Sequence, residues 1–134
     1  GSEMCIRDRD NMKSKLLKPV VFMGRSLEAL REFPDAVKDD VGHALREAQY
    51  GYKPASAKPL KGFVGAGVLE LVENYRGDTY RAVYTVRSRE VIYVLHCFQK
   101  KSKKGIKTTK QDIDLIKKRL KEADSNYRFS YAKK

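Results

Sequence analysis

Two apolar runs near the middle of the chain dominate its hydrophobic pattern. Residues 79–87 and 91–98 are rich in Val, Ile, Tyr and Thr, which fit a pleated and half-buried surface, and a polar break at 88–90 separates them. The pattern predicts a hairpin of two strands. Because the second run is apolar at nearly every position, we expect it to lie centrally in a sheet with both faces covered.

Shorter apolar runs predict further strands on either side of this hairpin. Residues 68–73 (VLELVE) predict a strand that a turn at 74–78 joins to the hairpin, which makes an antiparallel meander. Residues 18–23 (KPVVFM) predict a buried strand near the start of the chain. Residues 52–67, rich in Gly, Pro and Lys, predict a long loop of the kind that is often functional.

Apolar positions at helical spacing predict two helices after the first strand. Ser26 is the expected cap of a short helix over 27–33, and Pro34 suits the first turn of a second helix. Gly51 is the expected stop of the second helix. Gly42 lies inside that helix and weakens it, which close packing would explain.

A third helix is predicted near the C-terminus. Thr109 and Asp112 form a capping-box pattern ahead of about 15 helical residues, whose apolar stripe is Ile113, Ile116, Leu120 and Ala123. No pattern is evident over 125–134 beyond three aromatic residues. The order strand, two helices, three strands, helix predicts an α+β protein with helices packed on a sheet of about four strands.

The length of 134 residues suits one domain, which we place at 17–134. The polar, aperiodic residues 1–16 are predicted to be a tag or a disordered N-terminal extension, with Met12 as the expected native start. Because the only cysteines are Cys5 and Cys97, no disulfide framework is possible, and a reducing cytoplasm is the expected location. No signal peptide and no apolar run of the roughly 18 residues that cross a bilayer is present.

The strongly positive net charge predicts that the protein binds a polyanion. The chain carries 29 Lys and Arg against 17 Asp and Glu, which gives a net charge of +12. When lysine and arginine side chains neutralise the phosphates of a nucleic acid, bound counterions are released, and this release favours binding. The alternative is a well-hydrated basic surface. The uneven spread favours phosphate binding, since residues 100–121 hold ten basic side chains and only Asp112 and Asp114 oppose them.

Cofactor and metal sites are not expected. His43, His96 and the two cysteines are too few and too scattered for zinc. The glycine-rich stretch GFVGAG at 62–67 precedes a strand instead of opening a helix, which argues against nucleotide binding.

Three side chains of the predicted hairpin are candidates for chemistry. Arg81 is either a surface cation or a guanidinium that grips a phosphate and stabilises a phosphoryl transition state. His96 is either a satisfied core residue or a proton-transfer group. Phe98 is either core or a ring on which a nucleotide base stacks.

Lysines surround these candidates. The cluster after the last strand, in which one ammonium could act as general acid or base, is Lys100, Lys101, Lys103 and Lys104. Lys58 and Lys61 in the long loop could add phosphate contacts, although such lysines are usually just solvated.

Three stretches carry a resemblance to a known family. The sequence YRAVY at 80–84, the sequence VLHCFQKKSKKGIKT at 94–108, and the whole of 57–86 resemble the RelE/ParE superfamily of small bacterial toxins, in particular its HigB-like, phage-derived branch. The resemblance covers about 18–124. It implies a RelE-like fold, a small twisted antiparallel sheet with two N-terminal helices and one C-terminal helix.

The resemblance also implies an activity and partners. Members are toxins of type II toxin–antitoxin systems that cleave mRNA on the ribosome without a metal, by attack of a 2′-hydroxyl on the adjacent phosphate. A cognate antitoxin, expected to be a HigA-like helix-turn-helix protein, neutralises them. The alternatives are a ParE-like protein that inhibits DNA gyrase without catalysis, and a relic that only binds its antitoxin.

The resemblance also implies which residues of this chain form the site, because several of them match motifs of the family. Arg81 matches the strand arginine of Tyr–Arg–x–Val–Tyr, Lys101 falls where RelE has a second arginine, and Lys58 or Lys61 match its loop lysines. RelE has a catalytic tyrosine after the basic cluster, where this chain reads GIKT at 105–108, so His96 is the natural substitute. The implied catalytic set is Arg81, His96 and Lys101. The implied RNA-binding set is Lys58, Lys61, Phe98, Lys100, Lys103 and Lys104.

Overall fold

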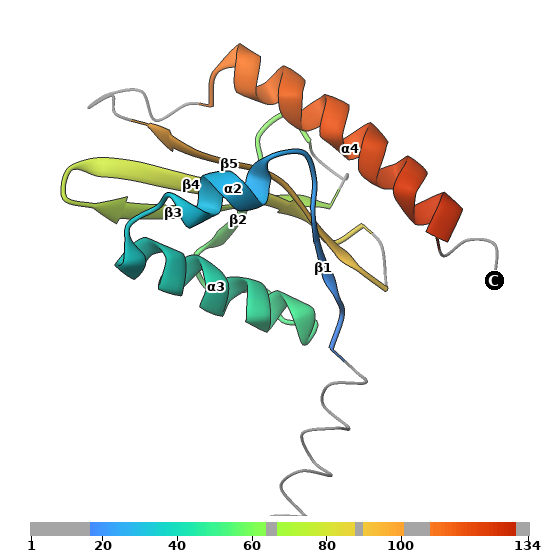
Figure 1. Ribbon diagram of the computed structural model, residues 1–134, viewed down its shortest axis with the longest axis horizontal. Coiled ribbons are helices and arrows are strands. Elements are labelled where there is room, and N and C mark those ends of the chain that lie inside the picture. Colours follow the sequence, from blue (N-terminus) through green and yellow to red (C-terminus); the bar gives the residue numbers. More distant parts are fainter. Residues whose placement is uncertain (1–16, 64–66, 88–89, 101–107, 131–134) are drawn as a thin grey trace, which may run out of the picture.

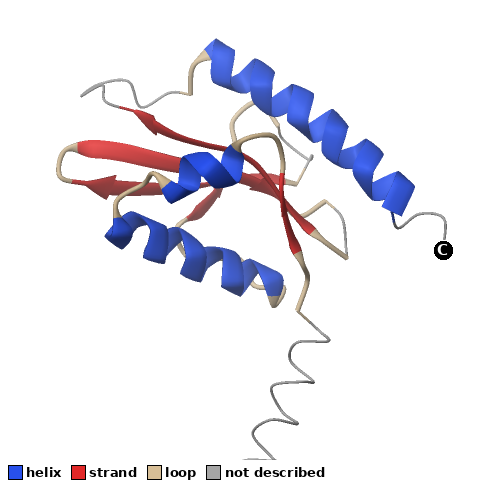
Figure 2. Ribbon diagram, in the orientation of Figure 1, coloured by secondary structure: helices blue, strands red, loops and turns tan. Residues whose placement is uncertain are grey.

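The computed structural model describes residues 17–63, 67–87, 90–100 and 108–130. Its elements, shown by type in Figure 2, are β1 (Val20–Phe22), α2 (Ser26–Arg31), α3 (Asp35–Gln49), β2 (Ala57–Pro59), β3 (Val68–Tyr75), β4 (Asp78–Thr85), β5 (Ile92–Lys100) and α4 (Lys110–Ser130). The predicted α+β class is confirmed, with five strands instead of about four. Residues 1–16, and with them the predicted extension, lie outside the described residues.

The five strands form one sheet in the order β1-β5-β4-β3-β2. β3, β4 and β5 pair antiparallel with their chain neighbours, as the predicted meander requires. β1 pairs with β5 in parallel, so the sheet is mixed and the expectation of a wholly antiparallel sheet is wrong. Hydrophobic patterns show that a segment is a strand but not in which direction it pairs.

The additional strand lies inside the segment that was expected to be a loop. β2 pairs antiparallel with β3, with Ala57 opposite Leu71 and Pro59 opposite Leu69. Its sequence, Ala–Lys–Pro, has no strand preference, and proline is tolerated only at a sheet edge. The strand β2 therefore forms because it pairs with the edge of β3, and not because of its own composition.

The connection between β3 and β4 is tighter than predicted. Only Arg76 and Gly77 lie between the two strands, with φ angles of 51° and 86°. Two consecutive positive φ angles are what a two-residue type I′ hairpin turn requires, and its twist matches that of the strands.

The sheet lies between two helical layers (Figure 1). α2 and α3 cover one face, where Val94 and Cys97 of β5 join the core, and α4 covers the other face, where Tyr93 and Leu95 join a second core. β5 is therefore buried on both faces, as its continuous apolar run predicted.

Two helix ends differ from prediction. Ser26 lies inside α2 instead of capping it, and its buried hydroxyl donates to the carbonyl of Val94 at 3.2 Å, which ties the helix to β5. α4 extends to Ser130 and so includes 125–130, six of the ten residues over which the sequence shows no pattern. Hydrogen bonds hold this last part, from Tyr93 to Asn126 and from Tyr127 to Glu90.

Gly24→Ala is expected to destabilise the protein by about 1–2 kcal/mol, because a side chain strains a positive φ. Gly24 has a φ of +56°, and an added Cβ would lie 2.6 Å from Nε of Arg119, which would have to leave its place against β5. The matched control is Gly42→Ala. A Cβ added at Gly42 would have no other atom within 4 Å, so close packing does not explain this exposed helical glycine. The change to alanine should stabilise the protein by about 1 kcal/mol. Urea denaturation measures both, and a neutral Gly24→Ala would contradict the expectation.

Candidate functional site

A β-bulge in β5 decides which face of the sheet carries His96. Val83 lies opposite His96, but the next residue of β4, Tyr84, lies opposite Val94, so Leu95 is an extra residue. A bulge re-aims the side chains that follow it. His96 consequently falls on the α4 side together with Phe98, which lies opposite Arg81. The structure thus brings Arg81 and His96 to one face, as their proposed joint role requires.

A cavity of about 560 Å³ opens on this face, beside the N-terminal part of α4. Its lining is Lys58, Leu60, Lys61, Gly62, Glu70, Val72, Arg81, Thr108 and Ile113. Three residues that the sequence singled out, Lys58, Lys61 and Arg81, therefore meet at one cavity although they come from β2, the segment after it and β4. Lys58 and Lys61 are exposed, so their ammonium groups are open to a ligand.

Arg81 is not the surface cation that one interpretation of the sequence favoured. Its side chain is 4 % exposed, and its Nη1 lies 2.7 Å from Oε2 of Glu70. Arg81 pairs with Val72 in the ladder, so Glu70 is its diagonal neighbour on β3, within reach of a long side chain. The guanidinium therefore forms part of the cavity wall with its charge balanced by a carboxylate.

Glu70 is the site residue that sequence reasoning missed. A signal was present, because Glu70 stands between Leu69 and Leu71 in an otherwise apolar strand, where an unpaired carboxylate is costly to bury. Its partner could not be found from the pattern, since the pairing depends on the β3–β4 register.

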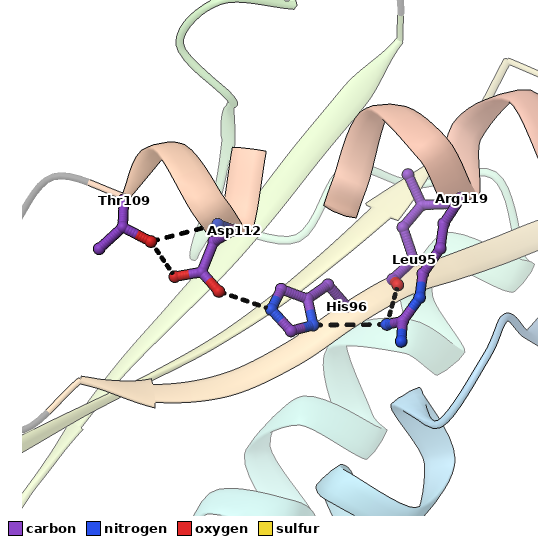
Figure 3. A network of polar contacts seen from close by, with 5 residues as sticks. All are labelled: Leu95, His96, Thr109, Asp112 and Arg119. Carbon is purple, nitrogen blue, oxygen red and sulfur yellow. Dashed lines mark hydrogen bonds and ion pairs between the residues drawn. The ribbon is translucent and has the colours of Figure 1, made fainter. Parts of the chain in front are cut away.

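His96 joins β5 to α4 through a polar network (Figure 3). Its Nε2 lies 2.9 Å from Oδ1 of Asp112, and its Nδ1 lies 3.4 Å from Nη1 of Arg119, which donates to the carbonyl of Leu95 at 2.8 Å. The hydroxyl of Thr109 donates to Asp112 at 2.7 Å and accepts the backbone N–H of Asp112 at 3.1 Å. Thr109 thus caps α4 as predicted, and the same carboxylate orients His96.

The electrostatics of the network favour a neutral imidazole. Burial lowers the pKa of His96 below its ordinary value, Asp112 opposes this effect, and the charge of Arg119 adds to it. Because Arg119 donates toward Nδ1, the proton of the neutral ring belongs on Nε2, where it is donated to Asp112. Both ring nitrogens therefore face residues of α4.

The remaining predicted residues lie around this network or beyond the described chain. Phe98 is half-buried and stacks on His96, with ring centroids 4.5 Å apart and an interplanar angle of 19°. Lys100 ends β5 opposite Thr79. Lys101, Lys103 and Lys104 lie outside the described residues. Burial raises the pKa of the Cys97 thiol to about 12, which leaves it unreactive.

The depressed pKa of His96 predicts a stability that falls in mild acid. The unfolded chain then binds more protons than the folded one, so stability rises with pH and is lost as the pH drops below the ordinary histidine value of about 6.5. Wild type should lose more unfolding free energy between pH 7 and pH 5 than His96→Gln. His43→Gln is the control, because its side chain is 80 % exposed, and it should follow wild type. Equal losses in all three proteins would contradict the assignment.

Along the part of the chain that the structure describes, no group of three or more His, Cys, Asp or Glu side chains is placed to hold a metal ion. Within the same ranges, no helix is long and apolar enough to span a membrane.

A mixed five-stranded sheet between α2–α3 and α4, with cations gathered at a cavity beside α4, defines a protein of RelE-like fold. A double arginine-to-alanine mutant of the Escherichia coli toxin RelE in the free state matches with a TM-score of 0.51 and 17 % identity, over 79 % of this chain and 97 % of that one. The toxin–antitoxin complex RelBE2 from Mycobacterium tuberculosis gives a TM-score of 0.41 at 20 % identity, over 65 % of this chain and 95 % of that one.

Residues 28–121 match the model of the family described as phage derived protein Gp49-like (DUF891), and the chain belongs to this family. The match confirms that the chain belongs to a phage-derived family, and the likeness to the RelE structure confirms the expected RelE-like fold. The comparison with curated protein sequences gives no significant match.

Proposed function

We propose that this protein is the toxin of a type II toxin–antitoxin system and acts as a ribosome-dependent endoribonuclease in the cytoplasm. The observation that carries the proposal is the convergence of Lys58, Lys61 and Arg81 on one cavity. Cations around a concave site bind a phosphodiester and stabilise the charge that develops during its cleavage. The fold shared with the toxin RelE supports the class of protein, but as an analogy it does not establish the reaction.

In this proposal the cleaved phosphate lies in the cavity between the exposed lysines and Arg81. The 2′-hydroxyl of the preceding nucleotide attacks the phosphorus, and the cations neutralise the added negative charge of the transition state. The lysines at and beyond the end of β5 extend the binding of the mRNA backbone, and Phe98 offers a ring for a base. These lysines are Lys100, Lys101, Lys103 and Lys104. Catalytic roles for His96 and Lys101 stay predictions.

His96 needs a rearrangement before it can transfer a proton to RNA. Its ring nitrogens face Asp112 and Arg119, so the arrangement described above fits a residue that positions α4 against β5. Asp112→Asn separates the two roles. A proton-transfer histidine should retain cleavage in that variant with a changed pH profile, whereas a positioning histidine should lose cleavage together with the stability of α4.

The expected partner is an antitoxin with an acidic and apolar binding surface, of the HigA-like helix-turn-helix type. We place its acidic residues against the basic cluster after β5 or against α2 and α3. A crosslinking map that finds full neutralisation with contacts only elsewhere would contradict a site-covering antitoxin.

The test is mapping of mRNA 5′ ends in a reconstituted translation reaction. Wild type should cut mRNA on the ribosome and leave it intact when ribosomes are omitted. The double variant Lys58→Ala/Lys61→Ala should cut at least about tenfold more slowly, because each lost charge-assisted contact costs on the order of 1.5 kcal/mol or more. Arg31→Ala/Arg46→Ala is the matched control, since both cations are exposed on the α2–α3 side.

Each failure has a distinct meaning. Intact mRNA together with inhibited DNA supercoiling would replace the proposal by a ParE-like gyrase inhibitor. Inactivity in both assays, with retained antitoxin binding, would make the protein a relic.

A further inference from the structure

We propose that Glu70 is the general base of the cleavage reaction, which takes the proton from the attacking ribose 2′-hydroxyl. The inference rests on the proposed function and names a residue outside the set that the family resemblance implies. The substrate class is a polynucleotide that carries a free 2′-hydroxyl beside the cleaved phosphate.

The position of Glu70 suits a base in this cavity. Glu70 lies on β3 between Lys58 of β2 and the diagonal partner Arg81 of β4, and all three line the same cavity. Its Oε2 accepts the hydrogen bond of Arg81, which orients the carboxylate. Among the described residues none donates a hydrogen bond to Oε1 of Glu70, and this oxygen is not among the buried polar atoms that lack a partner, so it keeps access to solvent and is available to a ribose hydroxyl.

The other titratable groups at the cavity are poorly suited to this step. Among the described residues that line it, Glu70 is the one carboxylate, and the other ionisable side chains are Lys58, Lys61 and Arg81. Arginine stays protonated in proteins, and an ammonium must first lose its proton before it can accept one. His96 has both nitrogens turned to α4, so it does not compete in this arrangement.

The local charge permits a carboxylate beside a phosphate. Three cationic side chains against one carboxylate leave the cavity with a net charge of +2, so an incoming phosphodiester is still attracted. When Glu70 takes up a proton, its carboxylate no longer offsets the charge of Arg81. The positive potential of the cavity then rises at the moment when the phosphorane gains its negative charge.

The proposed cleavage is a transesterification within the RNA, in which each bond that forms is matched by one that breaks. The 2′-hydroxyl gives its proton to Glu70 and its oxygen forms a bond to phosphorus, while the bond from phosphorus to the 5′-oxygen breaks. The departing 5′-oxygen takes a proton from the ammonium of Lys58 or Lys61. The products are a 2′,3′-cyclic phosphate and a 5′-hydroxyl, and no oxidant, reductant or metal takes part.

The experiment compares Glu70→Gln with Glu73→Gln on the full chain. Glu73 is the matched control, because it belongs to the same strand but lies beside Asp40 at a different cavity. Cleavage of ribosome-bound mRNA is measured in a single turnover, and binding of the variant to the programmed ribosome is measured separately. Glu70→Gln should slow cleavage by about 10²-fold or more with binding unchanged or tighter, whereas Glu73→Gln should match wild type.

The outcomes separate the two proposals. Cleavage by wild type with a Glu70→Gln rate within threefold would overturn the role of Glu70 and leave the nuclease intact. Absence of cleavage by wild type would overturn both. A rate loss that only follows weakened binding would assign Glu70 a structural role and reject catalysis.

A second variant, Glu70→Asp, tests the proposal if the Glu70→Gln protein does not fold. Glu70→Asp keeps the charge of the ion pair and draws the carboxylate back by one methylene. A loss of at least about tenfold in the single-turnover rate, with unchanged ribosome binding, supports a base that must reach the 2′-hydroxyl. An unchanged rate contradicts it.

Discussion

Replacing Arg81 by alanine is expected to destabilise the protein by about 3 kcal/mol, because it removes the ion-pair partner of the largely buried carboxylate of Glu70. The two side chains are 4 % and 13 % exposed, and their oxygen–nitrogen distance is 2.7 Å. Removing one partner of a buried pair costs far more than the pair itself contributes. The proposed cleavage of mRNA should be lost in the same variant, so activity alone cannot separate a catalytic from a structural Arg81.

A double-mutant cycle separates these effects. Arg81→Ala, Glu70→Ala and the double variant are compared by urea denaturation, and the double variant should be more stable than the sum of the single losses allows. The control cycle uses Arg25 and Glu28, an ion pair at 2.9 Å whose side chains are 84 % and 61 % exposed, and should show no measurable coupling. Equal coupling in both cycles would contradict a buried pair at Arg81.

The replacement of Ile116 by alanine is the second large expected effect, a loss of about 3 kcal/mol. Ile116 is fully buried in the core between α4 and β5, and a truncated side chain there leaves a cavity that the surroundings only partly fill. The wall of the site should loosen as well, because Ile113 and Thr108 line the basic cavity at the start of the same helix.

Urea denaturation and amide hydrogen exchange check this expectation. Exchange should accelerate along α4 more than along α3, which packs on the opposite face of the sheet. Lys117→Ala is the control, because the neighbouring lysine is exposed and should change stability by less than about 0.5 kcal/mol. Uniform acceleration across both helices would mean that α4 does not open as a separate unit.

The fold also links the two expected effects. α4 is held to β5 by Ile116 in the core and by the network from Thr109 through Asp112 and His96 to Arg119. Damage to either contact should therefore move one wall of the cavity away from Arg81. This coupling makes the helix part of the site although it contributes no residue to the predicted catalytic set.

Much of the architecture could be predicted because it is encoded locally. The apolar residues of 68–73 and the continuous apolar run of 91–98 identify two strands and the burial of one of them on both faces. The helical spacing over Asp35–Gln49 identifies α3, and Thr109 marks the start of α4. Such signals depend only on the backbone period and on caps within four residues.

The differences have a common physical origin in contacts between distant segments. β2 exists because the edge of β3 offers hydrogen bonds to a segment without strand preference. The last turns of α4 are held by Tyr93 and Glu90, more than thirty residues away. Neither contact leaves a periodic signal in the segment that it orders.

By itself the sequence determined the class of the fold and the basic character of the protein, and it marked Arg81, His96 and the loop lysines as candidate site residues. The tertiary structure alone decided that Arg81 is buried beside Glu70, and that a bulge at Leu95 turns His96 toward α4. The reason is that side-chain chemistry and periodicity are properties of the chain, whereas register, burial and ion pairing depend on which strands become neighbours.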